Sequence, residues 1–278
     1  MKTIDTLVED IYKVLEDGTE VTPHLRGSFQ TMCTKILDRA LTKYQGGSYI
    51  RMSNIGKKNR QLWYELKGYK GERISGNTLL KFLYGDIIEA LVLTLAKAAG
   101  HNVSNEQYQV NVDGIRGSID AVIDGELIDV KSCSTYAFNN KFKDVADLGD
   151  DEFGYAAQGA GYAAGMGMPF HGWLAIDKQN GSMRVAKATQ EDMPDASVLI
   201  AEKRAVAEME EPPERCYEDV PFQKSGNMQL ATGCSYCRYK GKCWEDANDG
   251  AGLRKFLYAG KPVFLTKVVV EPRVQEML

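Results

Sequence analysis

The sequence predicts an α/β protein, and three observations support that prediction. Apolar residues recur at helical spacing through much of the first hundred positions. At residues 108–131 apolar and polar residues alternate with a period of two, as in strands. Stretches with helical spacing and stretches with strand-like alternation then follow each other as far as residue 209. Of the 278 residues, 44% are hydrophobic and 26% charged, which is ordinary for a globular chain of one large domain, or of one domain with a small appendage.

Helices are expected wherever apolar residues recur every three or four positions. The first is expected at residues 4–15, and the second at residues 28–44, with Ser28 as its N-cap and the glycines at 46 and 47 as its end. The remaining predicted helices cover residues 61–65, 77–99, 154–165 and 196–209.

Strands are expected where apolar and polar residues alternate. They cover residues 108–112, 117–123, 126–131, 172–176 and 183–188. Residues 135–153 are polar, first basic and then acidic, and are expected to form a mobile loop. Residues 210–233 are acidic and contain proline, so we expect an irregular connection there.

The charge and hydropathy of the chain exclude several classes of protein. Lys and Arg total 34 against 38 for Asp and Glu, a net charge of −4, so a nucleic-acid surface has to be a local patch. No apolar run approaches the ~18 residues of a transmembrane helix. The first ten residues include acidic side chains and no apolar signal core. We therefore expect a cytoplasmic protein with no membrane partner, and the sequence predicts no particular oligomeric state.

The most informative part of the sequence is a predicted β-hairpin. Asp124-Gly125 is a strong signal for a two-residue turn. With that turn, Asp120 stands opposite Asp129 on one face, with Cβ atoms ~4.5–5.5 Å apart. Lys131, two residues further along, lies on the same face. The other face is predicted to enter the core with Ile119, Ala121, Ile123, Ile128 and Val130.

This pairing of acids predicts a cation site. Two carboxylates at that distance repel each other unless a proton or a cation lies between them. Oxygen ligands of this kind suit Mg²⁺ or Mn²⁺. Beside such an ion, Lys131 would orient or deprotonate an attacking water, or stabilise charge on a phosphate. The alternative is a solvated hairpin with an ordinary ion pair.

Two predicted helices add polar residues that fit the same site. Glu89 lies among apolar neighbours in the helix at 77–99, which places it near the buried side; the alternative is a surface glutamate. Gln158 and Tyr162 are four residues apart in the helix at 154–165 and therefore share one face. On a helix otherwise rich in Gly and Ala, this pair indicates a polar edge kept for a ligand, and the alternative is ordinary amphipathicity.

In this order, these residues resemble the PD-(D/E)XK nuclease superfamily, in its RecB-like branch. The matched pieces are Glu89, Ile119-Asp120, Asp129-Val130-Lys131 and the QxxxY signature from Gln158 to Tyr162. Residues 51–64 and the spacing Cys-x₂-Cys-x₅-Cys are similar to tailed-phage exonucleases, relatives of the CRISPR-associated iron–sulfur exonucleases. The resemblance extends from about Arg51 to Trp244.

The resemblance implies a restriction-endonuclease-like fold, in which a mixed central sheet is flanked by helices. It implies a metal site for one or two ions made by Glu89, Asp120, Asp129 and the Val130 carbonyl. It also implies catalytic roles for Asp120, Asp129, Lys131, Glu89, Gln158 and Tyr162, the last two contacting the DNA backbone or Lys131. The chain departs from many relatives in having Ile119 in place of Pro, and Ile88 where they have His, which puts more of the metal binding on Glu89.

A cluster of cysteines predicts a second metal site. Cys234, Cys237 and Cys243 provide three thiols within ten residues, and a closed site needs a fourth. Iron–sulfur relatives take it from a Ser-x₄-Cys motif, and the corresponding stretch here has no thiol. We prefer Cys216, which is close in sequence, over Cys33, which has that spacing one helix earlier. The resemblance favours a 4Fe-4S iron–sulfur cluster over zinc, and reduced structural thiols are the remaining alternative.

A local group of basic, aromatic and hydroxyl side chains is the predicted DNA-binding surface. Charge interleaved with aromatic rings suits contact with a phosphate backbone and stacking on bases of single-stranded DNA or the frayed end of a duplex. The alternative is a solvated basic turn with core aromatics. The predicted DNA-binding residues are Lys57, Lys58, Arg60, Trp63, Ser132 and Ser134.

Together these features predict a metal-dependent DNA exonuclease of bacteriophage origin, which would act in the host cell cytoplasm. We expect an N-terminal helical region with a basic turn at residues 1–75, a nuclease core at 76–211, and a cysteine-cluster segment stapled by metal at 212–278. The alternatives are a non-catalytic DNA-end-binding module, an RNA nuclease, or a CRISPR-type partner that trims DNA for an integrase.

Overall fold

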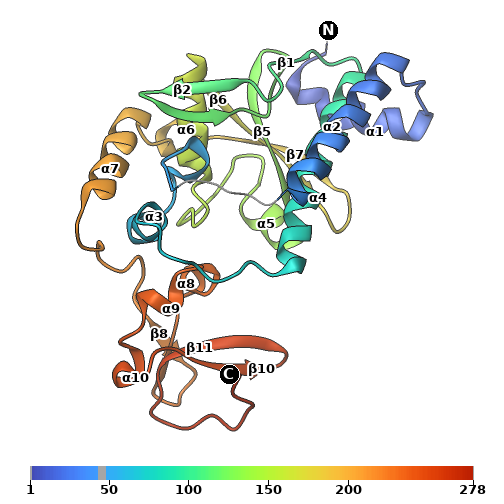
Figure 1. Cartoon of the computed structure of the whole chain (residues 1–278). Helices are drawn as coiled ribbons and strands as arrows, with labels where there is room; N and C mark the ends of the chain where they lie inside the picture. The colour runs from blue at the N-terminus through green and yellow to red at the C-terminus, as the bar shows by residue number, and fades with distance from the viewer. Residues whose placement is uncertain (1, 43–47, 278) are drawn as a thin grey trace. The chain divides into compact units, whose positions relative to one another are not determined.

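The computed structural model describes residues 2–42 and 48–277, and these form two compact units (Figure 1). The first comprises residues 1–56 and 75–202, and the second comprises residues 57–74 and 203–278. The boundaries of these units differ from those of the predicted ranges 1–75, 76–211 and 212–278, because residues 57–74 group with the C-terminal segment.

The first unit is mixed α/β. Its helices are η1 (Ile4–Thr6), α1 (Leu7–Asp17), α2 (Pro23–Leu41), η2 (Met52–Asn54), α4 (Gly76–Ala98), α5 (Thr135–Asn140), α6 (Tyr155–Met166) and η3 (Gln190–Asp192). Its strands are β1 (Val103–Ser104), β2 (Gln109–Val112), β3 (Ile115–Ser118), β4 (Ala121–Ile123), β5 (Glu126–Cys133), β6 (Phe170–Asp177) and β7 (Met183–Lys187). The helix α7 (Ala196–Glu208) begins in this unit and ends in the second.

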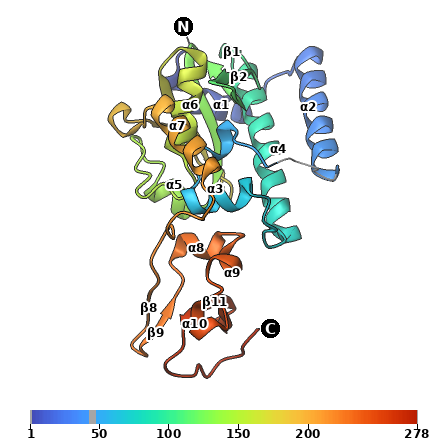
Figure 2. The same ribbon diagram turned by 60° about the vertical axis from the view of Figure 1, so that its left-hand side comes forward.

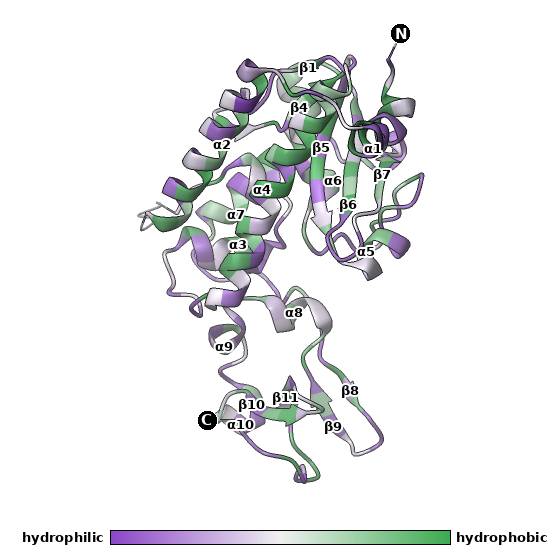
Figure 3. Ribbon diagram, turned by 90° about the vertical axis from the view of Figure 1, so that its right-hand side faces the viewer, coloured by the Kyte–Doolittle hydropathy of each residue, from purple (hydrophilic) through white to green (hydrophobic). Residues whose placement is uncertain are grey.

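A mixed central sheet organises the first unit, in the order β1-β4-β5-β6-β7. Strands β5 and β6 are parallel, and the other neighbours are antiparallel. The parallel pair requires a crossover, which α5 and α6 provide. The predicted mixed sheet with flanking helices is therefore confirmed. Figure 3 shows the apolar strands of this sheet, interrupted by a hydrophilic stretch in β5.

Both faces of the central sheet are covered. Helices α1 and α4 pack on one face, where Leu7 and Leu93 meet Ile128 of β5, all three almost fully buried. On the other face, α6 and the β2–β3 hairpin cover Leu127 and Trp173. Helix α2 packs along α4 (Figure 2). Parallel strands are usually buried on both faces in this way.

The turn of the predicted hairpin is confirmed. Asp124 and Gly125 both have positive φ, 52° and 91°, as a type I′ turn requires. The observed register pairs Ile123 with Glu126 and Ala121 with Ile128. Continuing that register by one residue brings Asp120 opposite Asp129, as predicted.

Two expectations about the same hairpin were wrong. The predicted strand at 117–123 is divided between β3 and β4, so Ile119 packs in the cluster opposite to that of Ala121. The face that carries Asp120, Asp129 and Lys131, which was not predicted to enter the core, is also covered, because Val122 and Leu127 on it are buried under the second layer. A single hairpin sequence does not show which distant segments will cover it.

Backbone contact between two glycines joins the start of α6 to the segment after η2. A Cβ placed on Gly56 would lie 2.4 Å from the Cα of Gly154, which has a positive φ of 72°. The N-terminus of α6 is capped by Asp151, whose two carboxylate oxygens accept from the N–H groups of Tyr155 and Ala156, each at 2.9 Å. These contacts fix the end of α6 that carries the polar residues.

Several predicted boundaries were wrong. The second helix begins at Pro23 with Thr22 as the cap that accepts from Leu25, and not at Ser28; its predicted end at 43–44 and the glycines at 46 and 47 lie outside the described residues. The predicted loop at 135–153 contains α5, capped by Ser134. The remaining predicted elements of this unit begin and end within a few residues of the observed ones.

The second unit has its own sheet and its own apolar clusters. Its elements are α3 (Asn59–Leu66), β8 (Val220–Phe222), β9 (Asn227–Gln229), α8 (Thr232–Tyr236), α9 (Lys240–Cys243), α10 (Ala247–Gly250), β10 (Arg254–Tyr258) and β11 (Lys261–Lys267). The sheet order is β10-β11-β9-β8. The predicted irregular connection at 210–233 was wrong in part, because it contains β8 and β9. Across both units, none of the described helices combines the length and apolarity of a membrane span.

Candidate functional site

Strand β5 carries the centre of the site. Asp129 and Lys131 alternate with Ile128 and Val130, so both point to the face of the sheet that α6 covers. Asp129 is only 2% exposed, and its Oδ2 forms an ion pair of 2.6 Å with the Lys131 Nζ. A buried carboxylate in the middle of a central strand needs a partner, and the partly buried Lys131 ammonium provides it.

Asp120 joins this pair from the link between β3 and β4. Its Oδ2 accepts a hydrogen bond of 2.7 Å from the Val130 N–H. Burial raises the pKa of Asp120 well above its usual value, and the negative charges of Asp129 and Glu89 raise it further. The hairpin turn therefore brings the two predicted aspartates together.

Glu89 reaches the same group of acids from α4. Its Oε1 accepts a hydrogen bond of 2.6 Å from the Gln107 Nε2. Burial, together with the charges of Asp129 and Asp86, raises the pKa of Glu89 to about 7. Glu89 is thus half-buried and faces the acids, rather than standing alone at the surface.

The acids are suited to a divalent cation, although they are engaged elsewhere in this structure. The buried Oδ1 of Asp129 has no hydrogen-bond donor among the residues that the structure describes. Within residues 2–42 and 48–277, no three Asp, Glu, His or Cys side chains are already gathered as a ligand shell. Asp120 Oδ2 instead accepts from a backbone N–H, and Asp129 Oδ2 pairs with Lys131. The Asp129 oxygen without a donor and the raised pKa values of Asp120 and Glu89 fit a cation site. A hard cation would offset the repulsion among these carboxylates.

Lys131 is held in its charged form. Burial alone would lower its pKa, but the charges of Asp129 and Asp120 outweigh burial and raise it above the usual value. An ammonium donates hydrogen bonds and cannot accept a proton. In this form Lys131 can stabilise phosphate charge or orient water, which are two of the roles expected for it.

Helix α6 supplies the predicted polar pair. The Lys131 Nζ lies 3.3 Å from the Gln158 Oε1, and the Gln158 Nε2 donates to the Tyr162 Oη at 2.8 Å. Burial raises the pKa of Tyr162, so its hydroxyl remains protonated. Gln158 and Tyr162 thus form a chain of hydrogen bonds that ends on the amine.

Two further residues belong to the site and were not predicted. Tyr155 places its ring 5.3 Å from the Lys131 Nζ, and its position three residues before Gln158 on the same helix was the available signal. Gln107 connects Glu89 to Ser118, whose hydroxyl donates to the Gln107 Oε1 at 3.1 Å. Gln107 lies in a loop between strands, where no periodicity identifies it.

The predicted DNA-binding residues of the second unit already have partners within it. Lys57 forms an ion pair with Glu65, and Lys58 lies 5.5 Å from the ring centre of Tyr217. Trp63 is 3% exposed, and its Nε1 donates to the Met209 carbonyl at 2.9 Å. Protein atoms therefore cover the ring of Trp63, and bases cannot stack on it as predicted. Trp63 is a core aromatic, as the alternative interpretation proposed.

The other residues of that set are placed differently. Arg60 donates to the Pro213 carbonyl at 2.6 Å. In the first unit, Ser134 caps α5, and Ser132 is half-buried on β5 immediately after Lys131. Ser132 is thus the one closest in sequence to the acids.

Four cysteines line one cavity in the second unit. They are Cys216, Cys234, Cys237 and Cys243. Burial is the main cause that raises the pKa of Cys234 to about 12, and the neighbouring thiols add to it. Cys33 lies in α2, in the other unit, and does not line this cavity. The four thiols share the lining of this cavity without being gathered as a ligand shell in the described structure. The preference for Cys216 over Cys33 stays a prediction.

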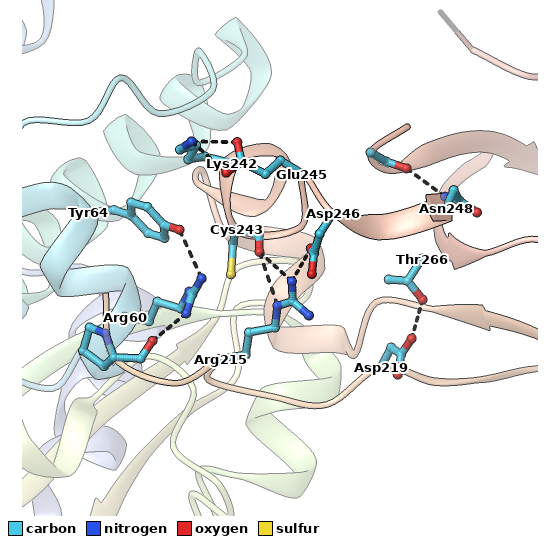
Figure 4. A network of polar contacts seen from close by, with 12 residues as sticks. Arg60, Tyr64, Arg215, Asp219, Lys242, Cys243, Glu245, Asp246, Asn248 and Thr266 are labelled. Carbon is cyan, nitrogen blue, oxygen red and sulfur yellow. Dashed lines mark hydrogen bonds and ion pairs between the residues drawn. The ribbon is translucent and has the colours of Figure 1, made fainter. Parts of the chain in front are cut away.

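Two buried N–H donors also line the cysteine cavity. The Arg60 Nε and the Trp244 Nε1 make no hydrogen bond of ordinary geometry to the described residues, and their side chains interact with thiols, Arg60 with Cys243 and Trp244 with Cys234. Arg60 and Arg215 lie beside Cys243, with the Arg215 Nη2 donating to its carbonyl at 3.1 Å (Figure 4). Buried donors are rarely left unpaired. Thiolates would be stronger acceptors for both donors than neutral thiols, so the donors and the four cysteines are compatible with a metal in this cavity.

Comparison with known proteins adds little. No family model matches the chain, and no curated protein matches it. The crystal structure of a protein named SSO0001 aligns with 76% of this chain and 93% of its own, at 14% identity and a TM-score of 0.40. A likeness at that level supports no conclusion about function.

Proposed function

We propose that the protein is a metal-dependent DNA exonuclease of the PD-(D/E)XK type, with a restriction-endonuclease-like core and a bacteriophage origin. The observation that supports this most is the convergence of Asp120, Asp129, Glu89 and Lys131, with a buried oxygen of Asp129 left without a donor. An ordinary ion pair would not need three acids beside one amine.

Each residue has a defined task in this proposal. Asp120, Asp129, Glu89 and the Val130 carbonyl would hold Mg²⁺ or Mn²⁺. When bound, the ion would lower the pKa of water and neutralise charge on the phosphate. Lys131, as an ammonium, would donate to a non-bridging phosphate oxygen, and Gln158 would keep it in place.

The reaction is a hydrolysis. The oxygen of water bonds to phosphorus, the bond from phosphorus to the 3′-oxygen breaks, and the 3′-oxygen leaves as a hydroxyl after gaining a proton. The products are 5′-phosphorylated nucleotides or short fragments. No residue needs to be oxidised or reduced.

A degradation assay on end-labelled DNA tests the proposal. Asp129→Ala, Asp129→Asn and Lys131→Ala should each reduce cleavage in Mg²⁺ by roughly 10²–10³-fold or more while DNA binding survives. Glu191→Ala, at an exposed acid outside the site, is the matched control and should cut normally. Wild-type rates in both Asp129 variants would show that the site is misassigned. Wild-type binding without cleavage in any divalent cation would favour the non-catalytic end-binding module.

We further propose that Cys216, Cys234, Cys237 and Cys243 bind a 4Fe-4S cluster, with zinc as the alternative. The shared cavity, and the two buried donors that face its thiols, support a metal there without distinguishing iron from zinc. A brown protein with about four irons per chain would support the cluster. A colourless protein with one zinc per chain would contradict it.

A further inference from the structure

A second, more open cavity lies beside the candidate site, within the first unit. Its volume is about 660 Å³, which is in the range of small-molecule sites. The β2–β3 hairpin, the segment around η2, and α6 form its walls, and these lie next to one another in Figure 1. Its lining includes Tyr49, Arg51, Arg116, Ser118 and Tyr162.

The lining of this cavity suits an anion with a flat ring. It includes the guanidinium groups of Arg51 and Arg116, and no acidic side chain occurs among its lining residues in the described chain. Arg116 is exposed, and no ion pair or hydrogen bond from another described residue engages its side chain. The ring of Tyr49 is also exposed, at 53%. A guanidinium binds phosphate in two-point contacts, and an exposed aromatic ring stacks on a base.

Two hydrogen-bond chains connect the cavity to the catalytic groups. Tyr162 lines the cavity and is bonded to Gln158, which contacts Lys131. Ser118 also lines it and is bonded to Gln107, which donates to Glu89. A ligand in the cavity therefore lies next to residues that contact both the amine and one of the acids.

From this juxtaposition we infer that the cavity binds a single DNA strand, at the nucleotide next to the scissile phosphate. Arg116 holds a phosphate, and Tyr49 stacks on the base. The cavity accommodates about one or two nucleotides and is too small for a duplex, whose paired strands would have to separate before entering. This inference rests on the proposed nuclease function and adds the form of the substrate.

The walls of the cavity depend on close packing of glycines. A Cβ on Gly117 would lie 2.4 Å from the Met52 Cβ and 3.2 Å from the Tyr162 ring. A Cβ on Gly161 would lie 2.1 Å from the Met52 Sδ. β3 and α6 can therefore both approach η2, and this sets the width of the cavity.

Binding measurements on the full chain in EDTA, where cleavage is stopped, test the inference. The probes are fluorescein-labelled oligo(dT) of twelve nucleotides and a blunt duplex of twelve base pairs. Arg116→Ala should weaken single-strand binding, and it should reduce the slope of log K against log salt by about 0.7, the contribution of one phosphate contact. Tyr49→Ala should weaken binding by roughly 5- to 100-fold with the slope unchanged, and Tyr49→Phe should bind normally. Arg273→Ala, at an exposed arginine of the other unit, is the control.

The outcomes separate this inference from the proposed function. If the wild type cuts DNA in Mg²⁺ but both cavity variants keep its affinity, salt slope and KM, the cavity is not the strand site. Tighter binding of the duplex than of the single strand by the wild type would also overturn it. If the wild type neither binds nor cuts DNA, the proposed function itself fails.

Discussion

Glu89 makes the stability of the folded chain depend on pH. Its pKa is about 7 in the folded protein against an ordinary value of 4.5, so the folded state binds this proton more tightly than the unfolded state. The resulting stabilisation is complete below about pH 4.5 and is lost as the pH rises through 7. At pH 8 without metal, the ionised Glu89 therefore destabilises the protein.

Glu89→Gln should consequently stabilise the metal-free protein at pH 8 by about 1–3 kcal/mol, and much less at pH 5. Urea unfolding in EDTA at the two pH values measures the difference. Addition of Mg²⁺ at pH 8 should stabilise the wild type more than the variant, because the cation replaces the missing proton. Equal differences at pH 5 and pH 8 would show that Glu89 is not perturbed by its neighbours.

Trp244 provides a test of the cysteine cavity at a single atom. Trp244→Phe keeps an aromatic ring beside Cys234 but removes the N–H that faces its thiol. If that N–H donates to a metal-bound thiolate, its loss should speed release of the bound metal to a chelator by about tenfold or more. Tyr236→Phe, at an exposed position in the same segment, is the control. Identical release from wild type and Trp244→Phe would exclude this hydrogen bond.

The residues that the sequence identified are those with a local signal. Asp120, Asp129 and Lys131 follow from one turn and a period of two, and Gln158 and Tyr162 from one helical spacing. Gln107 had no such signal, because it acts through a side chain that spans two elements. Trp63 is an aromatic residue among basic ones, as in a base-stacking site. Only the packing of residues 57–74 on 203–278 shows that it is buried.

For the helices and strands too, features with a local sequence signal could be predicted, and features that depend on distant segments could not. The Asp124-Gly125 turn fixed the register of β4 and β5, since a type I′ turn determines which residues are opposite. That both faces of the hairpin are buried depends on α4 and α6, which lie far away in sequence. The break between β3 and β4 likewise follows from packing against η2 and α6, and the alternating pattern of 117–123 conceals it.

The contact between Gly56 and Gly154 should be essential to the position of α6. Gly56→Ala would place a Cβ 2.4 Å from backbone, which cannot be relieved by turning a side chain. We expect a loss of about 1–3 kcal/mol or more in the free energy of unfolding, measured with urea. Gly27→Ala, in α2 with nothing within 4 Å, should be neutral or slightly stabilising. A Gly56→Ala protein as stable as the wild type would mean that the two segments are not in contact.

At the scale of the molecule, a distant segment completes the second unit. Residues 57–74 join the C-terminal residues through the Arg238 Nε, which donates to the Glu72 carbonyl at 2.9 Å, and through the stacked rings of Tyr64 and Tyr239. No sequence periodicity connects segments so far apart. The predicted ranges followed the order of the chain, whereas the contacts do not.

Removal of the proposed metal should therefore affect one unit more than the other. The apolar clusters of the second unit are small, with Cys234 and Trp244 central to one of them, so the four thiolates would have to supply much of its folding energy. In the first unit, the two larger clusters on either side of the central sheet contain no residue of the cysteine cavity. Hydrogen exchange before and after chelation, followed by mass spectrometry, measures the two units separately. Amides in α3, α8, α9 and β11 should exchange roughly tenfold faster or more without the metal, while those in β5 and β6 stay protected.

The same faster exchange should occur in Cys234→Ser, and Cys33→Ser should behave as the wild type. Loss of protection in β5 together with β11 would show that the two units unfold as one, and unchanged protection in both would show that the cysteines hold no structural metal.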